Sequence, residues 1–448
     1  MQAFFKGASD FEYTDFIHGF TSSSALIGCI IGSSLSGVFA GRLGRKRSLV
    51  FAGVCFFISA WGSMFPESWL LPAGRPSWDL LVVFNLYRVL GGIGVGMASA
   101  ICPMYIGEVA PSNIRGMLVS WNQFAIIFGQ LVVYFVNFII LGSHANPVYD
   151  AAGAIANMAD AQWTVTTGWR YMFGSECVPA GLFTVLICFV PETPRYLVMT
   201  GRDDRALGIL SRINGTQKAR EILQDIKDTI TVKTERLFSY GFLCIFVGIM
   251  LSVFQQAVGI NAVLYYAPRI FKDMGMDNEM VFTVFMGIIN ILFTLVAVFT
   301  VERLGRKPLL ICGSVGMALG AFGVAVTFGT PGLEMVTAAS IMVYSASFMF
   351  SWGPICWVLI AEIFPNTIRG AAVAVAVAFQ WIFNFIVSSS FVPMFNMHLT
   401  PGDDFGHWFT YGLYGLVCVL AALFVWRLVP ETKGKTLEDM TALWKKRK

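Results

Sequence analysis

Uncharged amide side chains stand inside long apolar runs of this chain, where polar groups are costly unless they have a role. Gln123 and Gln130 are seven residues apart, so they share one face of a helix. Gln380 and Asn384 are four residues apart and also share a face. Amides both donate and accept hydrogen bonds, as hydroxyl groups do. The pattern predicts a site for a neutral solute that carries several hydroxyl groups.

A second group of amides surrounds a glycine. Gln255 and Gln256 precede Gly259, and Asn261 follows it. Because glycine is conformationally permissive, it can loosen the helix and aim Asn261 at a different angle from Gln255. Tyr265 lies four residues after Asn261, on the same helical face. We expect these side chains to contribute to the same site.

Aromatic side chains accompany the amides. Trp381 follows Gln380, and Trp357 follows the pair 353–354 (Gly-Pro), where we expect a helix break, while Asn290 lies in the middle of another apolar run. Indole and phenol faces suit the apolar face of a sugar ring. For any one amide, a hydrogen bond between helices is the alternative interpretation.

The apolar runs show no residue pattern typical of a charged-substrate site, a catalytic site or a metal site. Lys and Arg do not cluster beside the amides, so we do not expect a phosphorylated sugar or an organic acid as substrate. The runs contain no Ser–His or His–carboxylate arrangement, and the nine cysteines form no CxxC pair. We therefore expect no enzyme activity, no metal site, no cofactor and no nucleic-acid partner.

Two charged residues lie deep in apolar runs. Arg88 is about 13 Å from the outer end of its run, at 1.5 Å per residue. Glu176 lies at a similar depth from the same side. A buried arginine needs a carboxylate partner. The two are candidates for proton coupling, and a purely structural ion pair is the alternative.

Three charged motifs occur twice, in the same order. Residues 42–46 (RLGRK) recur at 303–307, the pattern ExxPxxIRG at 108–116 recurs at 362–370, and PET at 191–193 recurs at 430–432. The guanidinium groups can bind carbonyls at helix C-termini and nearby carboxylates. We predict that these motifs form a cytoplasmic gating latch; the alternative is that their charges only set the topology. The latch residues are Arg42, Arg45, Glu108, Arg115, Glu302, Arg303, Arg306, Glu362 and Arg369.

Composition identifies the elements that must position these residues. Of the 448 residues, 56% are hydrophobic and only 13% are charged, which excludes a soluble enzyme and a disordered chain. Eleven windows are long and apolar enough to cross a membrane. Most of the 31 Lys and Arg residues fall on one side of these spans, which we take as cytoplasmic. The C-terminus is then inside, and the N-terminus of the chain as written is outside.

The repeats predict an all-α membrane protein with two helical bundles of parallel topology. We expect a polar segment at 1–22, an N-terminal bundle of five spans at 23–190, a cytoplasmic helical linker at 191–237, a C-terminal bundle of six spans at 238–428 and a cytoplasmic tail at 429–448. Two spans precede the RLGRK motif in the second half but only one in the first. The sequence thus predicts that the first helix of the N-terminal bundle is missing, with a natural eleven-span protein as the alternative.

The motifs resemble those of the sugar porter family of the major facilitator superfamily, within it most of all the bacterial D-xylose–proton symporters. The resemblance rests on RLGRK, PETPRYL (191–197), FQQAVGINAVLYYAP (254–268), SWGPICWVLIAEIFPNTIRG (351–370) and PETKGKTLE (430–438). The first RLGRK copy departs from the family signature, because Gly41 occupies the position of its acidic residue, whereas the second copy has Glu302.

The resemblance implies the major facilitator fold and transport of a monosaccharide by alternating access, with a proton, in the bacterial inner membrane. It implies sugar contacts by Gln123, Gln255, Gln256, Asn261, Trp357 and Gln380, with Gln130, Tyr265, Asn290 and Trp381 as second candidates. It also implies that Arg88 pairs with an aspartate on the first helix, which this chain lacks, with Glu176 in a modulating role. An uncoupled facilitator and a transporter-like sugar sensor or inactive fragment remain alternatives. We expect a monomer in the lipid bilayer.

Overall fold

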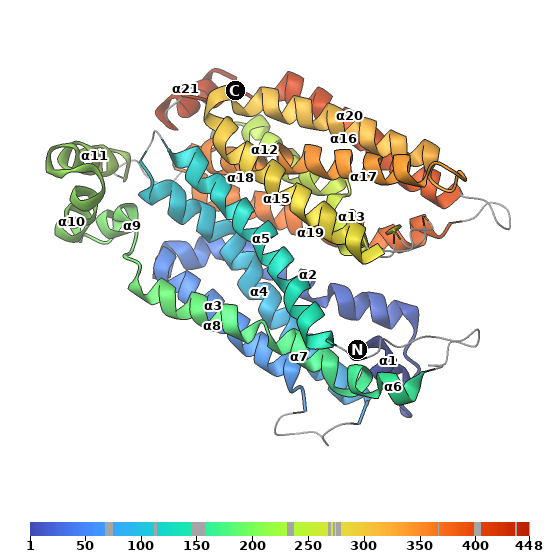
Figure 1. Ribbon diagram of the computed structural model, residues 1–448. Helices are drawn as coiled ribbons and strands as arrows, with labels where there is room; N and C mark the ends of the chain where they lie inside the picture. The colour runs from blue at the N-terminus through green and yellow to red at the C-terminus, as the bar shows by residue number, and fades with distance from the viewer. Residues whose placement is uncertain are drawn as a thin grey trace.

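The computed structural model describes residues 1–67, 75–111, 114–142, 144, 157–230, 237–267, 270–271, 274, 279–365, 367–397, 405–434 and 437–447. In this part of the chain, eleven helical segments are long and apolar enough to cross a membrane. Five belong to the N-terminal half and six to the C-terminal half, as two bundles that lie side by side (Figure 1). The all-α membrane architecture expected from the sequence is confirmed.

The N-terminal bundle contains four continuous spanning helices and one composite span. Thr14 and Ser77 accept hydrogen bonds from backbone N–H groups and so begin two of these helices. The elements are α2 (Asp15–Leu43), α3 (Arg45–Met64), α4 (Trp78–Val109), α5 (Arg115–Leu141), and a fifth span made of α6 (Met158–Trp163), the π-helix η1 (Thr164–Gly168), α7 (Trp169–Gly174) and α8 (Cys177–Phe189).

The C-terminal bundle contains two broken spans. Gly259 adopts a left-handed conformation, with φ of 89°, and separates the first two helices. Ser351, with φ of −130° and ψ of −90°, separates α17 from α18. The elements are α12 (Phe242–Ala257), α13 (Ile260–Tyr265), α15 (Glu279–Leu304), α16 (Arg306–Thr327), α17 (Glu334–Met349), α18 (Trp352–Glu362), α19 (Arg369–Phe395) and α20 (Phe405–Leu428).

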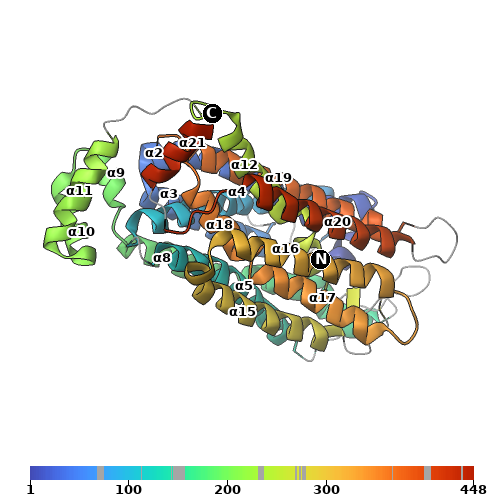
Figure 2. The same cartoon turned by 90° about the horizontal axis from the view of Figure 1, so that it is seen from above.

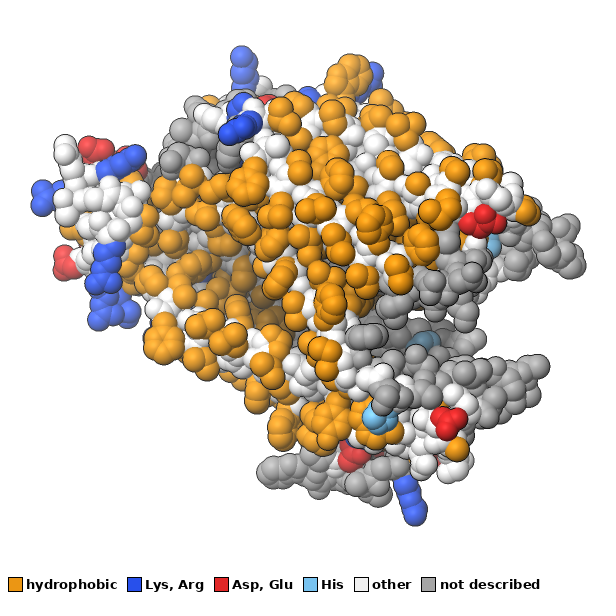
Figure 3. All heavy atoms as spheres, in the orientation of Figure 1, with side chains coloured by type: hydrophobic (Ala, Val, Ile, Leu, Met, Phe, Trp, Pro, Cys, Tyr) orange, Lys and Arg blue, Asp and Glu red, His pale blue; other side chains and the backbone are white. Residues whose placement is uncertain are grey.

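Short amphipathic helices lie at one end of the molecule. The linker forms α9 (Pro194–Met199), α10 (Asp203–Asn214) and α11 (Thr216–Ile230), which project beyond the bundles (Figures 1 and 2). The C-terminal helix α21 (Leu437–Arg447) packs on the same end through Trp444, whose indole donates a 2.8 Å hydrogen bond to the carbonyl of Ile363. Lys and Arg gather near this end, while hydrophobic side chains cover the flank between the two ends (Figure 3). This distribution marks the end with the linker as cytoplasmic.

The N-terminal segment differs from the expected polar leader. Its short helix α1 (Gln2–Lys6) carries Phe4 and Phe5, which are buried at the outer end of the N-terminal bundle. They pack against Trp169 and Phe84. The first spanning helix then begins at Asp15, earlier than residue 23, because Thr14 caps it.

The two bundles meet mainly through α2 and α5 of the N-terminal bundle. α2 packs against α19, and α5 packs against α15 and α18. At the first contact, a Cβ atom built on Gly37 would lie 3.2 Å from the carbonyl oxygen of Gly370. Glycine therefore allows close approach of the two halves at this point.

Candidate functional site

Four of the predicted amide side chains form one hydrogen-bonded network in the C-terminal bundle. Asn261 donates to the Oε1 atom of Gln256 at 2.6 Å, and Gln256 donates to Oε1 of Gln255 at 3.3 Å. Gln380 on α19 also donates to Oε1 of Gln255. The left-handed Gly259 makes this possible, since it ends α12 after the two glutamines and restarts the chain as α13 with Asn261.

The helix break before α18 brings backbone acceptors into the network. Gln255 Nε2 donates to the carbonyl oxygens of Trp352 and Gly353, each at 3.3 Å. These carbonyls lie in the first turn of α18, one turn before Trp357, which is buried. Four segments, α12, α13, α18 and α19, therefore converge on one cluster of neutral polar groups.

Gln123 brings the N-terminal bundle to this cluster. It lies on α5 and is only 6% exposed. A Cβ atom built on Gly353 would lie 3.3 Å from Nε2 of Gln123. The lack of a side chain at position 353 thus lets the amide of one bundle approach the broken helix of the other.

Several polar groups around the network have no partner in the part of the chain that the structure describes. Oε1 of Gln380 and Nε1 of Trp381 are buried and unpaired there. Tyr265, four residues after Asn261, is 51% exposed. Neutral donors and acceptors with spare capacity are what a sugar hydroxyl requires.

Two second-rank candidates have other partners. Asn290 is 2% exposed, and its Oδ1 accepts a 2.7 Å hydrogen bond from Ser345, which joins α15 to α17. Gln130 donates to the hydroxyl of Tyr134 on its own helix at 3.0 Å. For these two amides the geometry favours the alternative interpretation, a structural hydrogen bond.

Arg88 is half-buried and Glu176 is exposed, and the two lie within electrostatic range of each other. Among the described residues, however, no ion pair joins them, and the guanidinium of Arg88 stands over the ring of Phe173, 5.1 Å from its centroid. The structure shows an outer ion pair that the sequence analysis missed, between Arg170 and Glu67 at 2.7 Å. Their sequence separation gave no signal for it.

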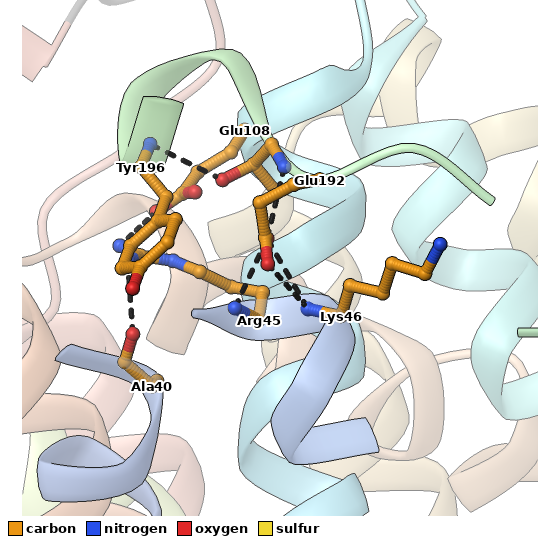
Figure 4. A network of polar contacts seen from close by, with 7 residues as sticks. Ala40, Arg45, Lys46, Glu108, Glu192 and Tyr196 are labelled. Carbon is orange, nitrogen blue, oxygen red and sulfur yellow. Dashed lines mark hydrogen bonds and ion pairs between the residues drawn. The ribbon is translucent and has the colours of Figure 1, made fainter. Parts of the chain in front are cut away.

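The first copy of the charged motifs forms a compact network (Figure 4). Arg45 is 7% exposed, donates to the carbonyl of Ala40 at 3.2 Å and pairs with Glu108 at 2.7 Å. Glu192, from the PET motif, accepts hydrogen bonds from the backbone N–H groups of Arg45 and Lys46. A carboxylate there satisfies the N–H groups that the start of α3 leaves unpaired.

The second copy repeats this arrangement. Arg306 pairs with Glu362 at 3.0 Å, and Glu431 accepts from the backbone of Arg306 and Lys307, each at 3.0 Å. Thr432 donates to the second carboxylate oxygen of Glu362 at 2.7 Å. The sequence repeat pointed to the acid–base pairs, but it did not assign the capping role of the PET glutamates.

These ion pairs do not bridge the two halves. Arg45, Glu108 and Glu192 belong to the N-terminal half, and Arg306 and Glu362 to the C-terminal half. Of the remaining predicted latch residues, the side chains of Arg115 and Glu302 lie outside the described residues, and Arg42 and Arg303 are exposed. Arg369 lines a small cavity beside Trp357, between the two halves.

Comparison with known proteins identifies the family of this chain. The family model described as "Sugar (and other) transporter" matches residues 2–444. The chain belongs to this family. It is 48% identical over 437 residues to the D-xylose-proton symporter of Escherichia coli, covering 95% of this chain and 86% of that protein. It is 35% identical over 440 residues to the glucose facilitated diffusion protein of Zymomonas mobilis, covering 96% and 88%.

A solved structure supports the same assignment. The proton:xylose symporter XylE bound to 6-bromo-6-deoxy-D-glucose superposes with a TM-score of 0.85 at 48% identity, over 96% of this chain and 89% of that one. The fold is therefore that of the major facilitator superfamily. With eleven spanning helices and these bacterial relatives, the protein is an integral protein of the inner membrane.

Proposed function

We propose that this protein is a secondary transporter that moves a neutral monosaccharide across the membrane by alternating access, in symport with a proton. One observation carries the proposal. Gln255, Gln256, Asn261 and Gln380 form one network in the C-terminal bundle, and Gln123 of the N-terminal bundle approaches it at Gly353.

The chemistry of the network favours a sugar over charged solutes. Its members are amides and backbone carbonyls, and the indole groups of Trp357 and Trp381 lie on the same helices, α18 and α19. None of these groups carries a charge. Each sugar hydroxyl both donates and accepts, which amides match in either orientation. Because groups from both bundles contribute, a bound sugar can be released when the bundles rock apart on one side.

Proton symport is supported by the relatives and by the two charges within the spans. Relatives named as symporters include the D-xylose-proton symporter and an arabinose-proton symporter of Bacillus subtilis, whereas the Zymomonas mobilis relative is a facilitated diffusion protein. We propose that Arg88 and Glu176 act in coupling, because Arg88 has no ion pair with any described carboxylate, and such a charge in a span responds to protonation of a neighbour. The protein is proposed to work as a monomer, since the amide site lies within one chain.

The test is uptake of a sugar panel into proteoliposomes, with and without a pH gradient. Xylose, arabinose, glucose and galactose separate pentoses from hexoses, and inward proton movement with the sugar separates symport from facilitated diffusion. Gln256→Ala should weaken sugar binding about tenfold or more, because it removes a hydrogen-bonding partner from a buried site. Gln224→Ala on the exposed helix α11 is the matched control. Sugar-independent proton movement, or equal affinity of the two variants, would refute the proposal.

A further inference from the structure

A second cavity lies away from the amide network. It has a volume of about 710 Å³ and opens between the cytoplasmic halves of α2 and α19. Ser34, Val38 and Gly41 line it on α2, and Ala371 and Ala378 line it on α19. The volume lies within the range typical of sites for small molecules, roughly 300–1,000 Å³.

The cavity has an exposed apolar rim. Val38 and Phe379 line it and are 51% and 37% exposed, although both lie within membrane-spanning helices. Exposed apolar side chains on a span are stable against lipid, so we take this rim to face the bilayer. Its wall on α19 runs from Gly370 to Ile382, about 18 Å at 1.5 Å per residue. This is close to half the hydrocarbon core, about 15 Å, so the groove reaches from the headgroup level toward the bilayer centre.

The cytoplasmic end of the groove is basic. Arg45 and Arg195 line it, and none of the lining residues is acidic. Arg45 is 93% buried, because only 7% of it is exposed, and its Nε atom has no partner among the residues that the structure describes. The two carboxylates beside Arg45 already have partners (Figure 4). Glu108 pairs with the guanidinium of Arg45, and Glu192 accepts a hydrogen bond from the backbone N–H at the start of α3.

A glycine creates the space beside Arg45. Gly41 lines the groove, and a Cβ atom built on it would meet no other atom within 4 Å. In the second repeat the equivalent position is Glu302, 261 residues later. The first half therefore lacks a negative charge at the place where it also has open room.

We propose that this groove binds an anionic phospholipid of the cytoplasmic leaflet. Its phosphate group lies beside Arg45 and Arg195 and supplies the charge that Gly41 does not, and one acyl chain lies along α2 and α19. Basic pockets between spanning helices on the cytoplasmic side suit anionic headgroups. Because α2 and α19 belong to different bundles, the lipid contacts both halves beside the contact of Gly37 with Gly370 and favours the state closed to the cytoplasm.

Native mass spectrometry of the purified full chain tests the site, with phosphatidylglycerol and phosphatidylcholine as probes. Phosphatidylglycerol should be retained about 30-fold more than phosphatidylcholine, equivalent to ~1 kcal/mol for each of the two basic residues. Gly41→Glu should remove this preference, while the uncharged Gly41→Gln should keep it. Val38→Trp should reduce retention of lipid by filling the groove, while Val185→Trp, on the exposed face of α8, should not.

Three results would overturn the inference. Equal retention of the two lipids would exclude an anionic headgroup site. Displacement of phosphatidylglycerol by inorganic phosphate at similar concentration would show a free-anion site with no role for the acyl chain. Unchanged retention in Val38→Trp would place the lipid elsewhere. None of these readouts depends on sugar transport, so the inference fails or stands apart from the proposed function.

Discussion

Replacing Glu108 by Gln should destabilise the N-terminal bundle by about 2–3 kcal/mol. The side chains of Arg45 and Glu108 are only 8% and 5% exposed, so solvent screens their interaction little. Loss of one partner of a buried pair costs roughly 3–5 kcal/mol. The cost in stability is smaller for glutamine, because its Oε1 atom can still accept a hydrogen bond from Arg45. In addition, Oε2 of Glu108 has no hydrogen bond to lose in the described structure.

A surface pair provides the matched control. Lys227 and Asp203 form an ion pair at 2.6 Å, but both side chains are 39% exposed. Exposed ion pairs contribute only about 0–1 kcal/mol, so Asp203→Asn should have little effect. The assay is unfolding in mixed micelles followed by tryptophan fluorescence, with both variants and the wild-type protein measured at one ionic strength.

The same experiment separates a structural role from a gate. Because Arg45 and Glu108 both belong to the N-terminal half, their pair should strengthen one bundle without holding the two together. We therefore expect the distance between spin labels at Leu43 on α2 and Ala371 on α19 to stay unchanged in Glu108→Gln. If Glu108→Gln were as stable as the wild-type protein but showed a longer distance between the labels, the reasoning would be refuted and the pair would belong to the gate. An equal loss of stability in Asp203→Asn would refute the argument from burial.

Further predictions concern the helix break and the cytoplasmic anchor. Gly259→Ala should lower stability by about 2–3 kcal/mol, because alanine is strained at φ of 89° and its Cβ would lie 2.5 Å from the ring of Tyr414. A variant that unfolds like the wild-type protein would contradict this. Trp444→Phe should cost about 1 kcal/mol and loosen α21, since it removes the bond to Ile363, and faster proteolysis of the C-terminal helix would report the change. Asn290→Ala should lower stability but leave sugar affinity intact, as a helix–helix contact requires; a binding defect in a stable variant would return Asn290 to the sugar site.

The positions of the spans and the bundle repeat follow from the sequence alone. A spanning helix must satisfy its backbone internally over about 20 apolar residues, so length and hydropathy locate it without knowledge of its neighbours. The basic loops set its orientation for a similarly local reason. Gly259 and the amides around it were also readable, since spacing along one helix fixes which side chains share a face.

The partner of each polar side chain was decided only by the tertiary structure. Gln255 was predicted as a sugar contact and Asn290 as a second candidate, both from amides in apolar runs and the family resemblance. In the structure Gln255 lies where four segments converge, whereas Asn290 binds Ser345 on a neighbouring helix. In the same way, the paired motifs predicted that Arg45 and Glu108 would meet, but not that Glu192 would accept from the backbone at the start of α3. The reason is that hydrophobic periodicity specifies which face of a helix is buried, whereas the rotation and crossing of packed helices decide which groups from distant segments come within hydrogen-bonding distance.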